Sequence, residues 1–322
     1  MSKTQKPTLA VGIDFGGTAV KIGLVDSTGH VREQHAVETA SIIAQPVWLD
    51  VMTARVRQFQ KDHGPILGVG VGVPGFTDFK RGFIFRLTNV PGWKSVHLAE
   101  ALRRRLKMPA FVDNDVNAMA VGECAFGAGR AYRHAVLATL GTGVGGGVVI
   151  DGRLYRGAFS MAGEIGHIPI YKDGLISPEG RGGLELYVGN RRIVEYTLAR
   201  LKTAPPSLIQ TLAEAQNAPI TPKIIAAAAR QGDQLALEIF DYVADCLATA
   251  FAGITYVLQP EVFIVGGGVA QSGRVLFTPL RRHLKQRLSP FFAARVRVIP
   301  ASLGEQAGMI GCAALVFQNA HE

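Results

Sequence analysis

Three glycine-rich turns, each at the end of an apolar strand, constrain what this chain can fold into. The first, 16–17, separates the β-branched runs 9–15 and 19–25. The second, 141–147, holds five glycines in seven residues, and the third, 266–268, directly follows the apolar run 262–265. A glycine pair alone is typical of an ordinary hairpin, but so many glycines impose an entropic cost that close backbone approach to phosphate oxygens would explain. Together the three turns indicate a nucleotide site on an α/β protein.

The other apolar segments suggest a plan that occurs twice. Strand-and-turn patterns near 14–18 recur near 139–147, and each is followed by segments with helical spacing. We predict helices at 45–61, 96–106, 116–126, 184–201, 275–288 and 304–317, and further strands at 67–73, 110–112, 262–265 and 296–299. This pattern predicts two related α/β lobes with a cleft between them. We place the lobes at 1–113, joined by the last helix (about 304–322), and at 114–303.

Composition narrows the class of protein. Of 322 residues, 48% are hydrophobic and 18% charged, which argues against disorder. No apolar run reaches about 18 residues, so no membrane span is expected, and the N-terminus lacks an apolar segment before a cleavage site. Cys124, Cys246 and Cys312 are odd in number and far apart, as expected of buried thiols in a reduced compartment. We therefore expect a cytoplasmic protein.

The net charge of 34 − 25 = +9 favours anionic partners. The arginine clusters at 103–105, 191–192 and 281–282 lie in amphipathic segments and are most simply solvated helix faces. No basic stripe interleaved with aromatic residues and no zinc-finger spacing accompanies them. We expect nucleotides or phosphorylated metabolites as partners, with neither nucleic acid nor membrane.

Polar residues concentrate where the strand 110–112 gives way to a helix. Asp113, Asn114, Asp115 and Asn117 are four acids or amides in five positions. A single N-cap requires one such residue, so the excess indicates ligand hydroxyls and a carboxylate base, although the motif alone does not decide between cap and ligand. The run 163–167, with Glu179 and Glu185 after it, could bind a polyol or be a loop held by an internal hydrogen bond.

These motifs, in this order, resemble those of the ROK family of bacterial sugar kinases and repressors. Residues 14–21 resemble its D-x-G-G-T-x-x-K signature, 72–75 its G-V-P-G turn, and 89–93 its N-x-P-G-W. Residues 114–118 with 122–123, and the runs 140–147, 163–167 and 265–268, also match. The resemblance covers nearly the whole chain. It implies the actin-like ATPase (hexokinase-type) fold, with ATP and a sugar bound between the lobes.

The resemblance also implies a role for each matching residue. Asp115 would be the general base for a sugar hydroxyl, usually O6, and Asp14 would hold Mg²⁺ through water. The sugar would contact Gly75, Asn89, Asn114, Glu164, His167 and Glu185. The nucleotide would contact Asp14, Gly16, Gly17, Thr18, Lys21, Gly141, Thr142, Gly143, Gly266, Gly267 and Gly268. Family members are often dimers, so we expect a homodimer.

One departure from the family pattern concerns a structural zinc. The family commonly uses the histidine of G-E-I-G-H with three cysteines, and here the cysteine positions hold Ile176, Pro178 and Gly183. His167 alone cannot form a tetrahedral site, so we expect no zinc. We predict that Pro178, the glycines and an Arg181 salt bridge order this loop instead.

Three functions remain to be weighed. We predict an ATP-dependent hexose kinase acting on glucose, with fructose, mannose, allose, GlcNAc or ManNAc as alternatives. A sugar-responsive repressor is disfavoured because only about eight residues precede the first strand, too few for a DNA-binding domain. An idle sugar-binding protein is disfavoured because Asp115 and the three glycine-rich turns are all present.

Overall fold

The first sheet is built from strands whose order departs from their order in the sequence. The computed structural model describes residues 7–88 and 90–320, and its first five-stranded sheet has the order β3-β2-β1-β4-β8. The strands are β1 (Leu9–Phe15), β2 (Ala19–Asp26), β3 (Val31–Glu38), β4 (Val69–Val73) and β8 (Ala110–Asn114). The hairpin β1–β2 is antiparallel, whereas β4 pairs in parallel with both β1 and β8. The carboxyl ends of β1, β4 and β8 therefore meet at one edge, where ligands bind in open α/β sheets.

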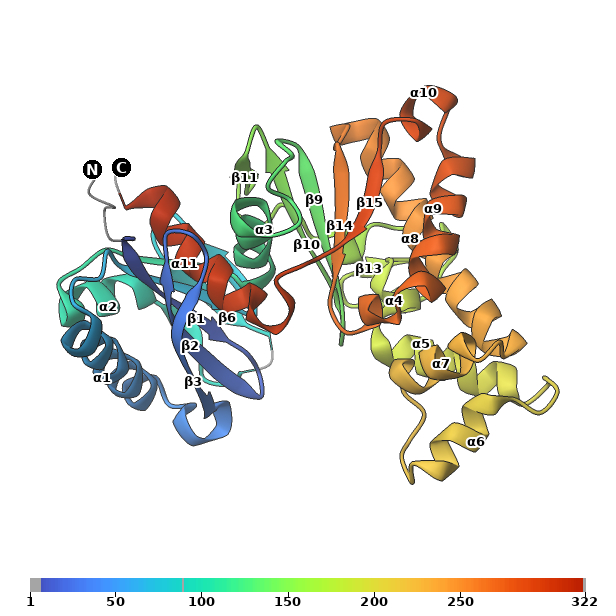
Figure 1. The fold of residues 1–322 in the computed structure, drawn as a ribbon, viewed down its shortest axis with the longest axis horizontal. Helices are drawn as coiled ribbons and strands as arrows, with labels where there is room; N and C mark the ends of the chain where they lie inside the picture. The colour runs from blue at the N-terminus through green and yellow to red at the C-terminus, as the bar shows by residue number, and fades with distance from the viewer. Residues whose placement is uncertain (1–6, 89, 321–322) are drawn as a thin grey trace, which may run out of the picture. The chain divides into compact units, whose positions relative to one another are not determined.

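Alternation along these strands gives the sheet two different faces. In β4, three valines alternate with two glycines, so the valines point to one face and the glycines to the other. The helices α1 (Gln45–His63) and α2 (Leu98–Leu106) cover the apolar face, and α11 (Ala307–Asn319) covers the glycine face (Figure 1). A Cβ at Gly70 would lie 1.8 Å from the carbonyl oxygen of Cys312, and one at Gly12 would lie 1.9 Å from that of Met309. The glycines therefore let α11 approach the strand backbones directly.

Glycines also allow two helices of this half to pack closely. The helix α3 (Asp115–Phe126) follows β8 without a loop and lies against α11. A Cβ at Gly311 would lie 2.0 Å from the carbonyl oxygen of Ala118, and one at Gly122 would lie 2.8 Å from the Cα of Gly311. The buried carboxylate of Glu123 adds to this junction by accepting the backbone N–H groups of Ser302 and Leu303 at 2.9 and 2.8 Å.

A second five-stranded sheet repeats the order of the first. Its order is β11-β10-β9-β14-β15, formed by β9 (Ala135–Leu140), β10 (Val144–Ile150), β11 (Arg153–Tyr155), β14 (Val262–Gly266) and β15 (Arg297–Pro300). As in the first sheet, the two strands at one end, β11 and β10, are antiparallel to each other, whereas β14 pairs in parallel with both β9 and β15. The repeated plan expected from the sequence is confirmed by this topology.

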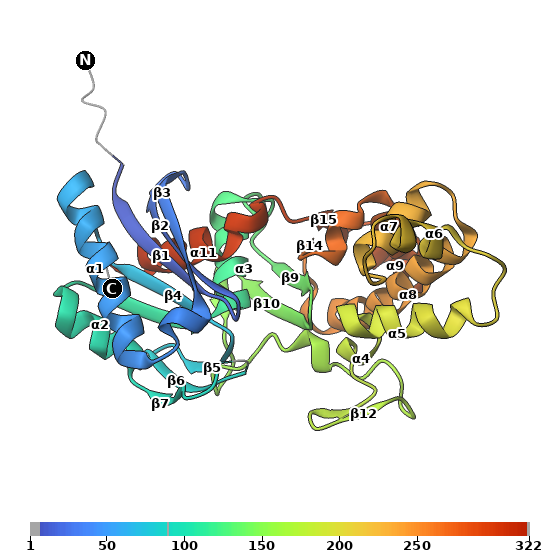
Figure 2. The ribbon, with the colours of Figure 1, turned by 90° about the horizontal axis from the view of Figure 1, so that it is seen from below.

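Helices dominate the second half of the chain, as predicted. They are α4 (Glu185–Val188), α5 (Asn190–Leu201), α6 (Leu208–Ala215), α7 (Pro222–Arg230), α8 (Gln234–Leu258), α9 (Arg274–Arg287) and α10 (Pro290–Ala293). The long helix α8 packs on the second sheet, where the ring of Phe251 stacks on Phe263 with centroids 4.2 Å apart, and α9 packs on α8 (Figure 2). Over the described ranges, none of the helices has both the length and the apolar character needed to cross a bilayer.

Several short elements escaped the sequence analysis. A three-stranded sheet joins β5 (Gly75–Asp78), β6 (Phe83–Leu87) and β7 (Lys94–Val96), and a small hairpin joins β12 (Ile176–Ser177) to β13 (Gly180–Arg181). Single turns of 3₁₀ helix occur as η1 (Thr39–Ile42), η2 (Ile165–His167), η3 (Val269–Ser272) and η4 (Gly304–Gln306). Runs of two to five residues are too short for hydrophobic periodicity to be recognised.

The described chain divides into two compact units. The first contains residues up to 131, 147–163 and those from 302 onward, and the second contains 132–146 and 164–301. The last helix lies in the first unit, and α3 lies there with it. The lobe boundary after residue 113 stays a prediction, because compactness does not show which segments move together.

The arginine clusters serve the fold. Arg103 donates to the carbonyl of Ala110 at 2.7 Å, and Arg281 donates to that of Val298 at 2.8 Å. Arg191 and Arg192 both pair with Glu195. Each cluster lies in a predicted helix, and these arginines bind groups of the chain itself. Cys246 and Cys312 are buried thiols, as expected, whereas Cys124 is partly exposed.

Candidate active site

The polar run at the end of β8 divides into structural and candidate catalytic residues. Asp113 is buried, and its carboxylate accepts hydrogen bonds from the amide of Asn117 at 3.0 Å and from Arg156 Nε at 2.8 Å. Arg156 Nη2 completes the salt bridge at 2.7 Å. Burial raises the pKa of Asp113, and Arg156 opposes that rise. Two of the four polar residues, Asp113 and Asn117, therefore hold the segment in place.

Asn114 and Asp115 are the residues of this run that stand at the helix start. Asn114 is the N-cap of α3, and its side-chain oxygen accepts the N–H groups of Val116 and Asn117 at 2.9 and 3.1 Å. Its amide nitrogen donates to the carbonyl of Gly75 at 3.2 Å, so two predicted sugar contacts touch each other. Asp115 is partly exposed and is the first residue of α3. The structure confirms the cap at Asn114, and the role of Asp115 as a base stays a prediction.

The first glycine turn places Asp14 against the C-terminal helix. A Cβ at Gly308 would lie 2.4 Å from Asp14 Oδ2, and Lys21 Nζ lies 3.3 Å from the carbonyl oxygen of Glu305. Burial raises the pKa of Asp14, and the positive charge of Lys21 opposes that rise. A carboxylate whose charge is so incompletely compensated suits a divalent cation, which prefers oxygen ligands. The residues Gly16, Gly17 and Thr18 form the tip, with Gly17 and Thr18 exposed.

The other two glycine turns meet in the second unit. Strands β9 and β14 are parallel neighbours, so the turns 141–143 and 266–268 leave the same edge of the sheet. A Cβ at Gly267 would lie 2.3 Å from the carbonyl oxygen of Leu140, and Gly267 has a φ of 85°. A Cβ at Gly141 or Gly268, by contrast, would meet no atom of the described residues within 4 Å. One glycine is required by packing, and the other two border open space that a ligand could occupy.

Acidic side chains gather beside the second turn. Glu185 Oε2 accepts the N–H of Val144 at 2.8 Å, and a Cβ at Gly143 would lie 2.3 Å from the same oxygen. Glu164 Oε2 lies 3.8 Å from His167 Nε2. Burial raises the pKa of Glu164; the charge of His167 opposes this rise, and those of Glu185 and Glu179 add to it. The predicted sugar contacts of this unit are therefore close enough to influence each other's charge.

Tyrosines order the loop in which the family pattern has cysteines. The hydroxyl of Tyr187 accepts the N–H of Leu175 at 2.8 Å, and its ring meets that of Tyr171 edge to face at 4.9 Å. Arg181 donates to the carbonyl of Gly174, so the expected salt bridge was wrong and a hydrogen bond stands in its place. In the described part of the chain, no three His, Cys, Asp or Glu side chains form a metal-binding group.

Sequence reasoning missed three residues of this region. Arg156 and Tyr187 lie far in sequence from their partners, and only the fold reveals them. Asn190 donates its N–H to the carbonyl of Gly141 at 2.9 Å, while its buried side-chain oxygen has no hydrogen-bond partner among the described residues. Its position directly after Gly189 was the one signal in the sequence, and its place beside the second turn is shown only by the fold. Asn89, a predicted sugar contact, lies outside the described residues.

Comparison with known proteins defines first the class of fold. A ROK family glucokinase from Streptomyces griseus, solved with glucose and AMPPNP, matches with a TM-score of 0.80 and 33% identity over 97% of this chain and 100% of its own. A ROK hexokinase from Thermus thermophilus matches with a TM-score of 0.79 and 26% identity, covering 98% and 99%. The chain therefore has the actin-like ATPase fold of these sugar kinases.

The sequence comparisons then give the family. The model of the ROK family matches residues 10–319. A glucokinase from Thermotoga maritima is 35% identical over 311 residues, which are 96% of this chain and 97% of that protein. The chain belongs to the ROK family, and it is a sugar kinase.

Proposed function

We propose that this chain transfers the γ-phosphoryl group of ATP to O6 of glucose, giving glucose 6-phosphate and ADP. The observation that carries this proposal is the identity of 33–35% with proteins named glucokinase, over 95–96% of the chain. The Streptomyces griseus glucokinase, which binds glucose and the ATP analogue AMPPNP, supports the same pair of ligands. We further propose that the protein is cytoplasmic and forms a homodimer. Light scattering of the purified chain would test the oligomeric state.

Asp115 is the general base in this proposal. As O6 attacks the γ-phosphorus, the new O6–P bond forms, the bond from phosphorus to the ADP oxygen breaks, and the O6 proton moves to the Asp115 carboxylate. Positioning and charge stabilisation supply most of the acceleration in phosphoryl transfer, so the base needs a fixed place more than a high pKa. The cap formed by Asn114 and the buried pair of Asp113 with Arg156 provide that fixed place.

The remaining residues bind the two substrates. The carboxylates of Glu164 and Glu185 would accept hydrogen bonds from sugar hydroxyls. His167, Asn114 and Gly75 would make the other contacts to the sugar. The turns 16–18, 141–143 and 266–268, with Lys21, would hold the phosphates and the nucleoside. When bound through water to Asp14, Mg²⁺ would neutralise charge on the phosphates. The open space at Gly141 and Gly268 supports the assignment of these two turns.

A coupled assay of ADP release tests the proposal. Mg-ATP is offered with glucose, fructose, mannose, allose, GlcNAc and ManNAc at equal concentrations, and phosphorylated products are identified by mass spectrometry. The proposal predicts the highest kcat/KM for glucose, with phosphate on O6. A higher value for another sugar would replace glucose as substrate and leave the kinase chemistry in place. No ADP release with any sugar would remove the kinase proposal itself.

A further inference from the structure

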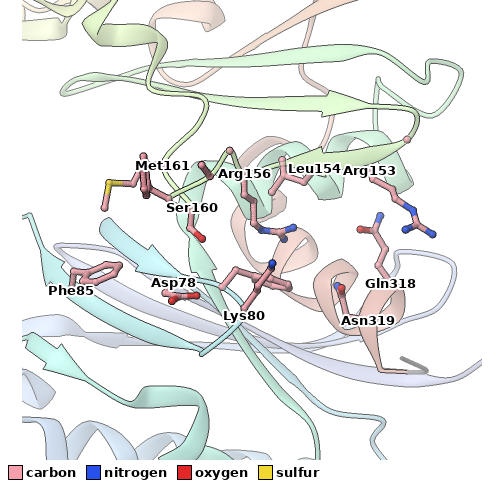
Figure 3. Close-up of a pocket in the computed structure, with 15 residues that line it drawn as sticks. Asp78, Lys80, Phe85, Arg153, Leu154, Arg156, Ser160, Met161, Gln318 and Asn319 are labelled. Carbon is pink, nitrogen blue, oxygen red and sulfur yellow. The ribbon is translucent and has the colours of Figure 1, made fainter.

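A pocket in the first unit has no part in the proposed reaction. Its volume is about 1130 Å³, and residues from the turn after β5, from 152–161 and from the end of α11 line it (Figure 3). None of the described residues assigned to sugar or nucleotide is among them. A pocket of this size accommodates a small organic ligand. The side chains around it indicate what kind of ligand that would be.

Three cationic side chains line this pocket. Lys80 and Arg153 come from different segments and are exposed, and within the described residues neither side chain has an ion-pair or hydrogen-bond partner. Arg156 is the third. Asp78 supplies the opposing carboxylate. Even with Arg156 neutralised by Asp113, a positive excess remains that would attract an anion.

Arg156 is held in one orientation before any ligand arrives. Its guanidinium lies 3.6 Å from the ring centroid of Phe79, and its Nε and Nη2 atoms are bound to Asp113. The Nη1 group takes no part in that salt bridge and is left for another acceptor. An arginine fixed in this way loses little side-chain entropy when it binds a phosphate oxygen.

The rest of the lining suits a hydroxylated body better than a bare ion. Asp78, Ser160 and Gln318 offer acceptors and donors for hydroxyl groups, and Figure 3 shows Asp78 and Ser160 projecting from facing segments. Phe85 and Met161 add partly exposed apolar surface, on which the carbon face of a sugar ring can pack. The Asp78 carboxylate would repel a free phosphate dianion but would accept a hydrogen bond from a sugar hydroxyl.

We propose that this pocket binds a phosphorylated sugar, with the phosphate on Lys80 and Arg156 Nη1 and the hydroxyls on Asp78 and Ser160. Arg153, which stands away from these residues beyond Gln318, adds positive charge that attracts the phosphate (Figure 3). The site is separate from the one that transfers phosphate, and the proposal does not depend on which sugar the kinase uses. Since Arg156 also holds Asp113, the ligand would be bonded to the residue that anchors the segment of Asp115.

Isothermal titration of the full chain with glucose 6-phosphate tests this proposal. Glucose and a non-hydrolysable ATP analogue are present at saturation, so that the proposed active site is filled. Inorganic phosphate is titrated separately. The variant K80A/R153A removes the two unpaired cations, and K223A/K285A removes two exposed lysines of the second unit as a charge-matched control. ADP release without added product is measured for each protein.

We expect glucose 6-phosphate to bind at least 10-fold more tightly than inorganic phosphate. We expect K80A/R153A to weaken this binding at least 10-fold, and K223A/K285A to change it less than twofold. Equal binding by wild type and K80A/R153A would overturn the proposal, as would inorganic phosphate binding as tightly as glucose 6-phosphate. ADP release in K80A/R153A at the wild-type rate would show that the kinase function stands in either case.

Discussion

Replacing Arg156 by methionine tests how strongly the buried salt bridge supports the segment of the proposed base. Asp113 is 1% exposed and Arg156 is 20% exposed, so the variant R156M leaves a carboxylate in the interior without its cation. Removing one partner of a buried pair costs about 3–5 kcal/mol. With a urea m-value of about 2–3 kcal/mol/M for a unit of this size, the midpoint should fall by about 1–2.5 M.

Tryptophan fluorescence reports on the relevant half of the molecule. The chain has two tryptophans, Trp48 and Trp93, and both are buried in the core of the unit that contains Arg156. The control R104M removes an exposed pair with Glu100, which is worth no more than about 0.5 kcal/mol. R104M should therefore leave the midpoint nearly unchanged.

Acidity gives a second readout of the same pair. Burial already raises the pKa of Asp113, and loss of Arg156 raises it further, so the variant takes up a proton more readily than wild type. The stability difference between wild type and R156M should therefore narrow as the pH falls from 7.5 to 5. The double variant D113N/R156M should regain most of the loss. A midpoint shift below about 0.3 M in R156M, or no recovery in the double variant, would refute the reasoning.

Three further predictions concern packing, the loop and the proposed metal ligand. G311A should lower the free energy of unfolding by more than about 2 kcal/mol, because its Cβ would overlap a backbone oxygen. G253A, at a position in α8 where a Cβ meets no described atom within 4 Å, should leave the free energy of unfolding unchanged or raise it by up to about 1 kcal/mol. Y187F should speed hydrogen exchange at the N–H of Leu175 and proteolysis of its loop, because it removes the hydroxyl that accepts this N–H. Exchange and proteolysis at the wild-type rates would contradict this prediction. D14N should abolish ADP release, because it removes the carboxylate proposed to hold Mg²⁺. It should also raise the urea midpoint at pH 7, since burial raises the pKa of Asp14 and the ionised carboxylate therefore destabilises the folded state. This gain in stability should shrink as the pH falls, and a lower midpoint at pH 7 would contradict the prediction.

Most of the fold could be predicted from the sequence because its strands carry their own signals. The alternation of valine and glycine in β4 and the glycine turn after β1 identify strands and a turn without tertiary information. The repeated order of the two sheets follows from the repeated strand-and-turn pattern. The short strands β5 to β7 could not be found, because their pairing is decided by contacts with residues up to 12 positions away.

The candidate site residues were proposed from the sequence, but the residues that hold them in place were not. The run at 113–117 contained too many polar side chains for one cap. The structure shows that Asp113 and Asn117 anchor the segment and that Asn114 caps α3, whereas the role of Asp115 as base stays a prediction. The partner of Asp113 is 43 residues away, so nothing near it in the sequence identifies Arg156. The tyrosines that order the loop at 171–187 were missed because Tyr187 lies 12 residues from Leu175, whose N–H it accepts, and no local pattern joins the two.

The measurement that most directly tests the central claim is single-turnover phosphoryl transfer by D115N, with glucose binding followed on the same samples. The control D62N makes the same chemical change at an exposed position in α1. If Asp115 is the base, D115N loses at least about 10²-fold in the rate of transfer, while its Kd for glucose changes less than about threefold and D62N matches wild type. Transfer by D115N within about threefold of the wild-type rate would contradict the account.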